Sequence, residues 1–215
     1  MAVHDEFIRR LRAVPANTAA LRVERKRISK EVAGFDHTAL LRLAHKLIDA
    51  GIARFVAYEL VLNHGPTMES ITQDEVEKLG QGMRHWGQVD AFACFVSGPA
   101  WRSGRIGDDV ILTWAHSEDW CWRRAALVST VPLNSRAQGG AGDAKRTLTV
   151  CRMLIADRDD LVVKAMSWAL RELGKRDPES VRGFLSDHRD QLAARVVREV
   201  NSKLTTGLKN PRQAP

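Results

Sequence analysis

The sequence predicts an all-α fold, and three observations lead to this prediction. Residues that start and stop helices recur along most of the chain. The apolar residues between them recur at spacings of three and four, which is the period of a helix face. Stretches with the alternating pattern of a strand are scarce, and the best candidate, Val110–Trp114, lies among helical signals.

Each predicted helix is bounded by a capping residue at its start or by a glycine or proline at its end. The first half contains four of these predicted helices. The first runs from Asp36 to Gly51, and the second covers residues 52–64 and ends at Gly65-Pro66. The third is opened by the capping box Thr72–Glu75, and the fourth runs from Val89 to Val96 and ends at Gly98-Pro99. In the second half they are one that begins at Ser117 or Asp119 and ends at Pro132, one that begins at Asp143, one from Asp157 to Gly174, one opened by Asp177-Pro178-Glu179, and one from about Gln191 to Leu204.

The prolines indicate that the helices are paired. Between Pro15 and Pro211, three of the five successive proline intervals are 33 residues long, within the period of HEAT, armadillo and tetratricopeptide repeats. We therefore expect one domain over residues 1–215, a right-handed α-solenoid of HEAT-like two-helix repeats with a concave basic face, and a flexible tail over 208–215. The alternative is an irregular helical bundle.

Composition excludes several classes of protein. The chain of 215 residues carries 33 Lys and Arg against 26 Asp and Glu, a net charge of +7 that favours polyanionic partners. The charged start does not resemble a secretory signal, and the longest apolar run, Ala91–Val96, is too short to cross a membrane. The three cysteines form no CxxC pair, which argues against a disulfide framework and a structural zinc site. We expect a cytoplasmic, nucleoid-associated protein in a reducing compartment.

One carboxylate and one arginine have no oppositely charged neighbour on their own predicted helices. The residues three and four positions from Asp90 are Trp86, Gly87, Ala93 and Cys94. Those at the same distances from Arg124 are apolar residues, tryptophan or cysteine, whereas the adjacent Arg123 can pair with Asp119. An unpaired charge on an apolar helix face is costly, so either Asp90 and Arg124 pair across a helix interface or both line a cleft and meet charges of a ligand.

All six tryptophans lie between residues 86 and 168. Trp86 lies four residues before Asp90 and therefore on the same helix face. Trp168 lies between Lys164 and Arg171, which makes it a candidate ligand platform beside two cations or, alternatively, a lid over the edge of the core. The other four are expected to be core or boundary residues; they are Trp101, Trp114, Trp120 and Trp122.

Such a set of residues is suited to one kind of chemistry. Tryptophan faces can stack on a base, arginine can bind a phosphate with two hydrogen bonds, and a carboxylate can stabilise an oxocarbenium-like sugar and orient a water molecule. A lesion base that already carries positive charge departs as a neutral base, so a single carboxylate suffices. These residues therefore favour hydrolysis of an N-glycosidic bond in DNA.

Four segments also match the pattern of a known family. They are Trp86-Gly-Gln-Val-Asp90, Trp122-Arg-Arg124-Ala-Ala-Leu127, Ala165-Met-Ser-Trp168 with the later Asp177-Pro178, and the tail Leu204-Thr-Thr-Gly-Leu-Lys209. In these segments the chain resembles the DNA alkylation repair proteins, the AlkD-like alkylpurine DNA glycosylases, which are built from HEAT-like repeats. The resemblance spans residues 86 to 209, and the N-terminal third matches in helical character and length only.

The resemblance implies a role for each matched residue. Asp90 would be the catalytic carboxylate, Trp86 and Trp168 would contact the lesioned nucleotide, and Arg124 would hold the DNA backbone near the lesion. We also expect Lys164 and Arg171, which flank Trp168, to bind DNA. Family members excise cationic 3- and 7-alkylpurines and need no metal or cofactor. The implied partner is double-stranded DNA with alkylated purines. The protein is expected to act as a monomer and not to bind a membrane.

Two other functions remain open at this point. The first is a non-catalytic HEAT-like module that binds nucleic acid or protein. The second is an unrelated helical enzyme that uses histidines, for which the candidates are His37, His45, His64 and His85. These histidines lack the HExxH spacing of a zinc enzyme, so surface or core positions are the expected alternative.

Overall fold

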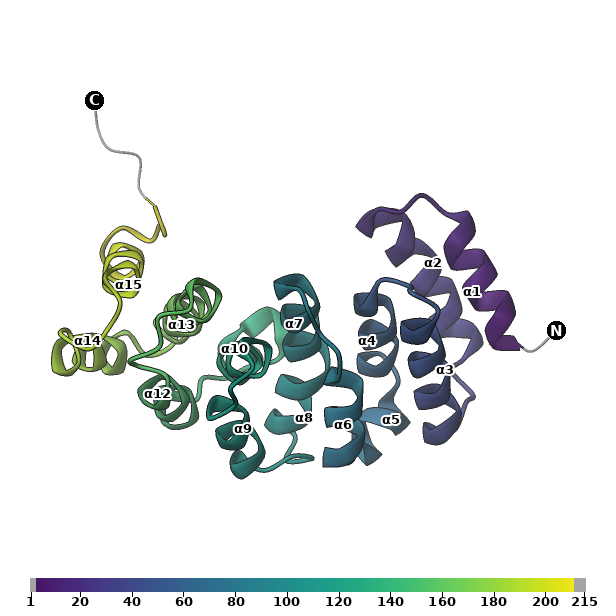
Figure 1. Ribbon diagram of the computed structural model, residues 1–215, viewed down its shortest axis with the longest axis horizontal. Helices are drawn as coiled ribbons and strands as arrows, with labels where there is room; N and C mark the ends of the chain where they lie inside the picture. Colours follow the sequence, from purple (N-terminus) through teal and green to yellow (C-terminus); the bar gives the residue numbers. More distant parts are fainter. Residues whose placement is uncertain (1–2, 211–215) are drawn as a thin grey trace.

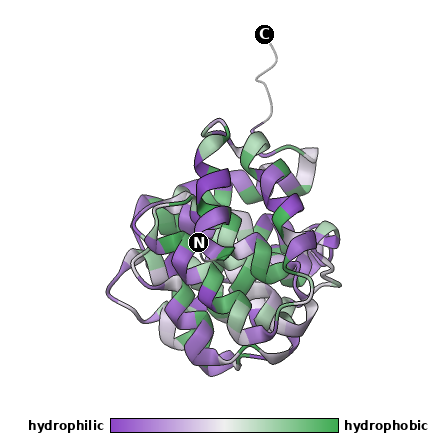
Figure 2. Ribbon diagram, turned by 90° about the vertical axis from the view of Figure 1, so that its right-hand side faces the viewer, coloured by the Kyte–Doolittle hydropathy of each residue, from purple (hydrophilic) through white to green (hydrophobic). Residues whose placement is uncertain are grey.

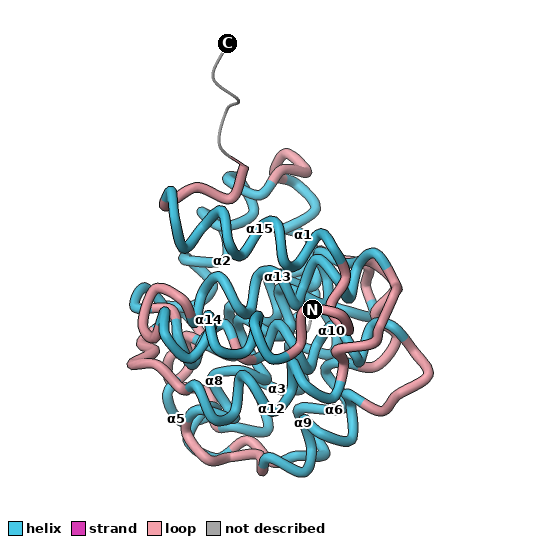
Figure 3. Tube along the Cα trace, turned by 90° about the vertical axis from the view of Figure 1, so that its left-hand side faces the viewer, coloured by secondary structure: helices cyan, strands magenta, loops and turns pink. Residues whose placement is uncertain are grey.

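The computed structural model describes residues 3–210, and every regular element within this range is a helix (Figure 3). In chain order the elements are α1 (Val3–Ala13), α2 (Thr18–Glu31), α3 (His37–Asp49), α4 (Arg54–Leu62), α5 (Gly65–Ser70), α6 (Gln73–Gly80), α7 (Trp86–Phe92), the π-helix η1 (Ala93–Ser97), α8 (Gly98–Arg102), α9 (Asp108–Ala115), α10 (Trp120–Ser129), α11 (Val131–Asn134), the 3₁₀-helix η2 (Arg136–Gln138), α12 (Ala144–Met153), α13 (Asp160–Leu173), α14 (Pro178–Asp187) and α15 (Ala194–Thr206). The all-α prediction is confirmed for the described residues.

The helices follow one another along an arc, and the helices at its two ends, α2 and α15, lie on the same side of it (Figure 1). One row runs along the inner side, where α4 packs on α7, α7 on α10, α10 on α13 and α13 on α15. The outer row includes α3, α9 and α12, each of which packs on a helix of the inner row. This two-layer arrangement is consistent with the predicted α-solenoid, in which each helix is covered mainly by its neighbours along the array.

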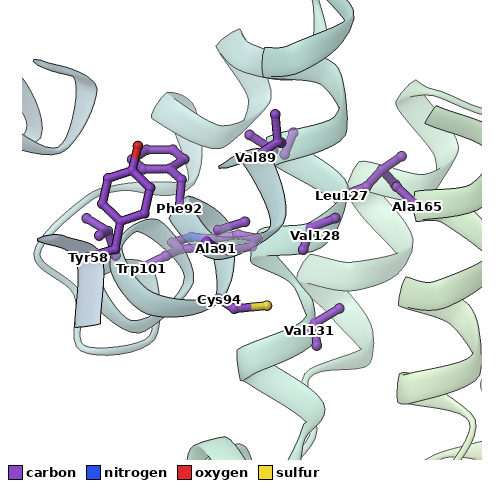
Figure 4. Close-up of a cluster of buried hydrophobic side chains, with 14 of the residues drawn as sticks. Tyr58, Val89, Ala91, Phe92, Cys94, Trp101, Leu127, Val128, Val131 and Ala165 are labelled. Carbon is purple, nitrogen blue, oxygen red and sulfur yellow. The ribbon is translucent and has the colours of Figure 1, made fainter. Parts of the chain in front are cut away.

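A continuous hydrophobic core lies between the two rows. Hydrophobic stretches of the helices gather towards the middle of the molecule, and hydrophilic stretches lie around them (Figure 2). In the centre of the core, Phe92 of α7 and Leu127 of α10 are fully buried. Tyr58 and Trp101 are also buried there, with no more than 1% of either residue exposed (Figure 4). Burying an aromatic or leucine side chain contributes about 2–3 kcal/mol, so this packing sets the spacing of α7 and α10.

Several predicted helix boundaries are confirmed by their caps. Asp36 accepts a hydrogen bond from the Ala39 amide, and Asp177 accepts one from the Ser180 amide. The capping box is complete, because Thr72 and Glu75 each accept a hydrogen bond from the other residue's backbone amide. Of the two predicted starts for α10, Asp119 is the N-cap, and its carboxylate accepts from the Cys121 amide at 2.8 Å.

Of the three helix stops predicted at prolines, two are confirmed to within three residues, since α4 ends at Leu62 and α10 ends at Ser129, and the stop at Gly98-Pro99 is wrong. Gly65-Pro66 begins α5, Gly98-Pro99 begins α8, and Pro132 lies in the first turn of α11. Proline is tolerated in a first turn because the amide it lacks has no partner there in any case. The run that contains Asp90 therefore continues through η1 into α8 without a break in helical backbone.

Smaller differences concern the strand candidate and two helix starts. The strand candidate Val110–Trp114 is the body of α9. The helix predicted to begin at Asp157 is capped by Asp159, because the Asp157 side chain accepts from the Asp159 amide in the preceding turn. The last helix begins at Ala194 instead of Gln191, which lies in a turn that is closed onto His188.

The remaining findings concern the cysteines, the tail and membrane spans. Cys94, Cys121 and Cys151 are free and buried. Of the predicted tail 208–215, residues 211–215 lie outside the described range, while Lys209 forms an ion pair with Glu199 at 3.3 Å. Within residues 3–210, no helix has both the length and the apolar character needed to cross a lipid bilayer.

Candidate functional site

Two of the predicted site residues lie one turn apart on α7. His85 is the N-cap of this helix, and its Nδ1 accepts a hydrogen bond from the Gly87 amide at 3.1 Å. Trp86 follows directly and is half exposed, with its ring 5.2 Å from that of His85. Asp90 lies one turn further along, and 17% of its side chain is exposed. The spacing therefore places an accessible indole and a partly accessible carboxylate on one face, as predicted.

Asp90 and Arg124 form a two-pronged ion pair across the interface between α7 and α10. Arg124 Nε donates to Asp90 Oδ1 and Arg124 Nη2 donates to Oδ2, both at 2.8 Å. The arginine side chain is only 6% exposed. Of the two possibilities that the sequence left open, the structure shows the pairing, while the carboxylate keeps an exposed edge.

The same guanidinium reaches a third helix. Its Nη1 donates to the backbone carbonyl of Leu161 in the first turn of α13. Arg124, on α10, thus connects α7 and α13. Its three guanidinium nitrogens each donate a hydrogen bond within the protein. An arginine held in this way fixes the plane of the Asp90 carboxylate, because both of its oxygens are bonded to one rigid group.

Its neighbour Arg123 behaves differently from the prediction. Arg123 was expected to pair with Asp119, but that carboxylate caps α10. Arg123 Nε donates instead to Asp157 at 2.7 Å, and its Nη1 donates to the carbonyls of Ser117 and Glu118. Asp157 lies in the loop before α13, so Arg123 and Arg124 both tie α10 to the start of that helix.

The other three predicted residues lie along α13. Trp168 is partly buried and packs against the hydrophobic core, as a residue at the core edge would. Lys164 is exposed and pairs with Asp160 at 2.6 Å. Arg171 is half-buried, its Nε donates to Ser167 Oγ at 3.2 Å, and burial lowers the pKa of its guanidinium. Trp168 lies about two helical turns beyond Leu161, the residue that Arg124 contacts.

The four remaining tryptophans are core or boundary residues, as predicted. Trp101 and Trp114 are almost fully buried, and their indole N–H groups donate to Asp108 and Glu77. Trp122 is partly buried, and its ring lies 4.9 Å from that of Trp114. Trp120 also packs against the core from the start of α10.

Three of the four candidate histidines have structural contacts. His37 Nε2 bonds to Glu75 at 2.9 Å, and His64 and His85 cap α5 and α7. Among the described residues, no group of three histidine, cysteine or carboxylate side chains is placed to hold a metal ion. Burial raises the pKa of the Cys94 and Cys151 thiols to about 12, so neither thiolate is available as a nucleophile at neutral pH.

Sequence reasoning did not identify two cavities near these residues. One, of about 380 Å³, lies beside the turn before α7 and the start of α10, where Arg84 and Trp120 line it. The other, of about 350 Å³, lies between α13 and α15, and three arginines line it. Each is formed by segments far apart in the chain, so no local spacing signals it.

Comparisons with known proteins identify the family of the chain. A sequence model of a family described as DNA alkylation repair enzyme matches residues 13–204. The chain belongs to this family. One solved structure, described as a predicted DNA alkylation repair enzyme from Enterococcus faecalis, is similar with a TM-score of 0.70 and 17% identity over 94% of this chain and 92% of that chain. No curated protein sequence matches the chain.

Membership of the DNA alkylation repair enzyme family confirms the resemblance found in the sequence. It extends the match to the N-terminal helices from residue 13, where no motif was recognised. The likeness to the Enterococcus faecalis structure independently supports the fold, since nearly the whole of both chains is superimposed. A role in the repair of alkylated DNA, with DNA as the partner, follows from the family.

Proposed function

We propose that the protein is a monofunctional DNA glycosylase that hydrolyses the N-glycosidic bond of cationic 3- and 7-alkylated purines in duplex DNA. The observation that carries the proposal is the Asp90 carboxylate, which Arg124 holds in a fixed plane one turn from the exposed Trp86. Such a carboxylate is preorganised, because it does not have to reorient when positive charge develops on the deoxyribose.

The ion pair leaves the carboxylate able to act. A carboxylate has about four lone-pair positions, and Arg124 occupies one on each oxygen. The exposed edge of Asp90 can therefore accept a hydrogen bond from a water molecule and direct it at the anomeric carbon. The alkylated purine departs as a neutral base, so no general acid and no metal or cofactor is required.

The remaining residues are assigned to binding. Trp86 offers an exposed indole face to the lesioned nucleotide and its sugar. Trp168, with Lys164 and Arg171 beside it, provides a second surface on α13 for the DNA. Arg124 contributes mainly by holding Asp90, because its guanidinium nitrogens donate hydrogen bonds within the protein. To contact a DNA phosphate, the guanidinium has to break at least one of these hydrogen bonds.

The test is release of 3-methyladenine or 7-methylguanine from methylated duplex DNA. We expect release by the wild type and a loss of about 100-fold or more in the single-turnover rate for Asp90→Asn, because the amide carries no charge. Asp187→Asn, an exposed carboxylate on α14, is the matched control and should retain the wild-type rate. The absence of release by wild type that binds duplex DNA would refute the proposal.

A non-catalytic DNA-binding module is the second candidate. It is favoured by the pairing of both Asp90 oxygens with Arg124, which is also how a purely structural carboxylate is held. On this alternative, Asp90→Asn and wild type bind duplex DNA equally and neither releases a base. Product measurement and binding measurement on the same two variants therefore separate the candidates.

A further inference from the structure

A cavity lined by three arginines lies where the first turns of α13 and α15 meet. Its volume is about 350 Å³, and its lining residues are Arg158, Asp160, Val163, Ala193, Arg195 and Arg198. We call it the arginine pocket. These two helices lie, together with α14, at the C-terminal end of the arc (Figure 1).

The three guanidinium groups are held to different degrees. Arg158 is anchored by backbone carbonyls, with Nη1 donating to Asp157 at 2.9 Å and Nη2 to Gln191 at 2.8 Å. Arg195 forms an ion pair with Asp160. Arg198 is exposed, and it has no ion pair or side-chain hydrogen bond to any residue in the range 3–210. Two arginines are thus placed by the protein, and the third is available to a ligand.

The pocket is positively charged overall. Its single carboxylate, Asp160, serves both Arg195 and Lys164, the latter at 2.6 Å. The cations therefore outnumber the carboxylate and leave an uncompensated positive charge beside Arg158 and Arg198. The first turn of α15 adds to this potential, because its N-cap, Ala193, supplies no side-chain acceptor to the helix amides.

We propose that the arginine pocket binds a phosphate of the DNA backbone at a fixed distance from the lesion. This inference rests on the proposed function and adds a contact that positions the duplex. Arginine is suited to phosphate because its planar fork donates two parallel hydrogen bonds. A backbone phosphate contact sets the register of the protein on the duplex without reading the base.

The position of the pocket along α13 relates it to the candidate site. Asp160 and Trp168 lie eight residues apart, a distance of about 12 Å along the helix axis. Asp160 also directly precedes Leu161, whose carbonyl accepts from Arg124, so the pocket lies at the end of α13 that adjoins the Asp90–Arg124 pair. A contact at this distance would hold the flanking duplex while the site acts on the lesion.

The experiment is a scan with neutral methylphosphonate linkages in a duplex that carries an uncleavable abasic-site analogue. We expect one or two linkages in the duplex beside the analogue to weaken wild-type binding about tenfold. Arg198→Ala should lose about the same affinity for the unmodified duplex and become insensitive at that linkage. Arg198→Lys should retain part of the affinity, because it keeps the charge and loses the fork.

The matched control is Arg152→Ala on α12 of the outer row. Arg152 is also exposed and has no side-chain partner among the described residues, but it lies away from the pocket. It should bind as wild type does at every linkage. Equal sensitivity of wild type and Arg198→Ala across the scan would overturn the inference.

The source of the phosphate is tested by competition with inorganic phosphate. If Arg198→Ala loses affinity for inorganic phosphate while its duplex affinity is unchanged, the pocket is a site for a free anion and the inference is wrong. If the wild type binds duplex DNA and releases base, and Arg198→Ala has the same duplex affinity as the wild type, only the phosphate contact is overturned. A wild type that binds no duplex refutes the proposed function as well.

Discussion

Arg124 is the side chain on which the geometry of the candidate site depends. It emerges from α10, bonds to both oxygens of Asp90 on α7, and reaches the Leu161 carbonyl on α13. A mostly buried pair of this kind adds little net stability compared with apolar packing, because both charges lose hydration. Its effect is to define the relative position of three helices and the orientation of one carboxylate.

Removing Arg124 should therefore affect stability and activity together. Arg124→Ala leaves Asp90 without its partner, and we expect the free energy of unfolding to fall by about 3 kcal/mol in urea denaturation. Arg124→Lys keeps the charge but cannot bond to both oxygens, so base release should slow more than stability falls.

Arg182→Ala is the control for charge removal at the surface. Arg182 forms an exposed ion pair with Glu179 within α14, and its loss should change stability by less than about 0.5 kcal/mol. Equal stability of Arg124→Ala and Arg182→Ala would show that the ion pair with Asp90 is not maintained in solution.

At the scale of single elements, the continuation of α7 through η1 into α8 depends on Gly98. A Cβ atom at this position would lie 2.6 Å from Pro132 Cγ, 2.7 Å from the Ala93 carbonyl oxygen and 2.8 Å from the Ser129 carbonyl oxygen. Two of these contacts are with backbone, which cannot move aside easily. The glycine thus allows α10 and α11 to approach the helical run that carries Asp90.

We expect Gly98→Ala to lower the free energy of unfolding by about 1–3 kcal/mol, because the added methyl group is forced against backbone. Gly183→Ala is the matched control. Gly183 also lies within a helix, α14, but a Cβ atom there meets nothing within 4 Å, so this change should stabilise by about 0.5–1 kcal/mol. Thermal or urea unfolding of the two variants checks both signs.

The N-cap of α14 predicts a dependence of stability on pH. Asp177 accepts hydrogen bonds from the hydroxyl and the amide of Ser180, and these lower the pKa of its carboxyl below the ordinary value of 3.8. Because the folded-state pKa is depressed, this contribution to stability is present above pH 3.8 and is lost as the pH falls through the folded-state pKa.

Asp177→Ala should therefore be less stable than wild type at neutral pH, and the difference should shrink as the pH falls below 3.8. Urea unfolding of both proteins between pH 6 and pH 3 measures it. A difference that stays constant over this range would mean that the carboxylate charge does not contribute to the cap.

At the scale of the whole molecule, exposed cations lie at both ends of the arc. On α2 near the N-terminus, Lys26 and Lys30 are exposed, and on α15 Arg198 is exposed. Both ends rise on the same side of the molecule (Figure 1), the side along which the inner row runs. A duplex that lies along this side can contact both ends.

Binding to both ends should be seen in the salt dependence of duplex affinity. Each phosphate contact contributes about 0.9 to the slope of log K against log salt, so the double variant Lys26→Ala with Lys30→Ala should lower the slope by about one to two. Fluorescence anisotropy at several salt concentrations measures the slope. An unchanged slope would restrict the DNA contacts to the C-terminal half of the arc.

The sequence alone determined the helical class, most of the helix caps and the face shared by Trp86 and Asp90. These features depend on residues within one helical turn of each other, so spacing is sufficient to predict them. The error at Gly98-Pro99 arose because proline is compatible with both the end of one helix and the first turn of the next. Local sequence does not distinguish these two positions.

Tertiary structure alone decided the partner of each unpaired charge. Arg124 lies 34 residues from Asp90, and Arg123 pairs with Asp157, also 34 residues away, instead of with Asp119 on its own turn. The arginine pocket likewise joins the starts of two helices that are separated along the chain by α14. Such contacts depend on how one helix packs on the next, and the packing is set by the whole core, so no single stretch of sequence contains the information that fixes them.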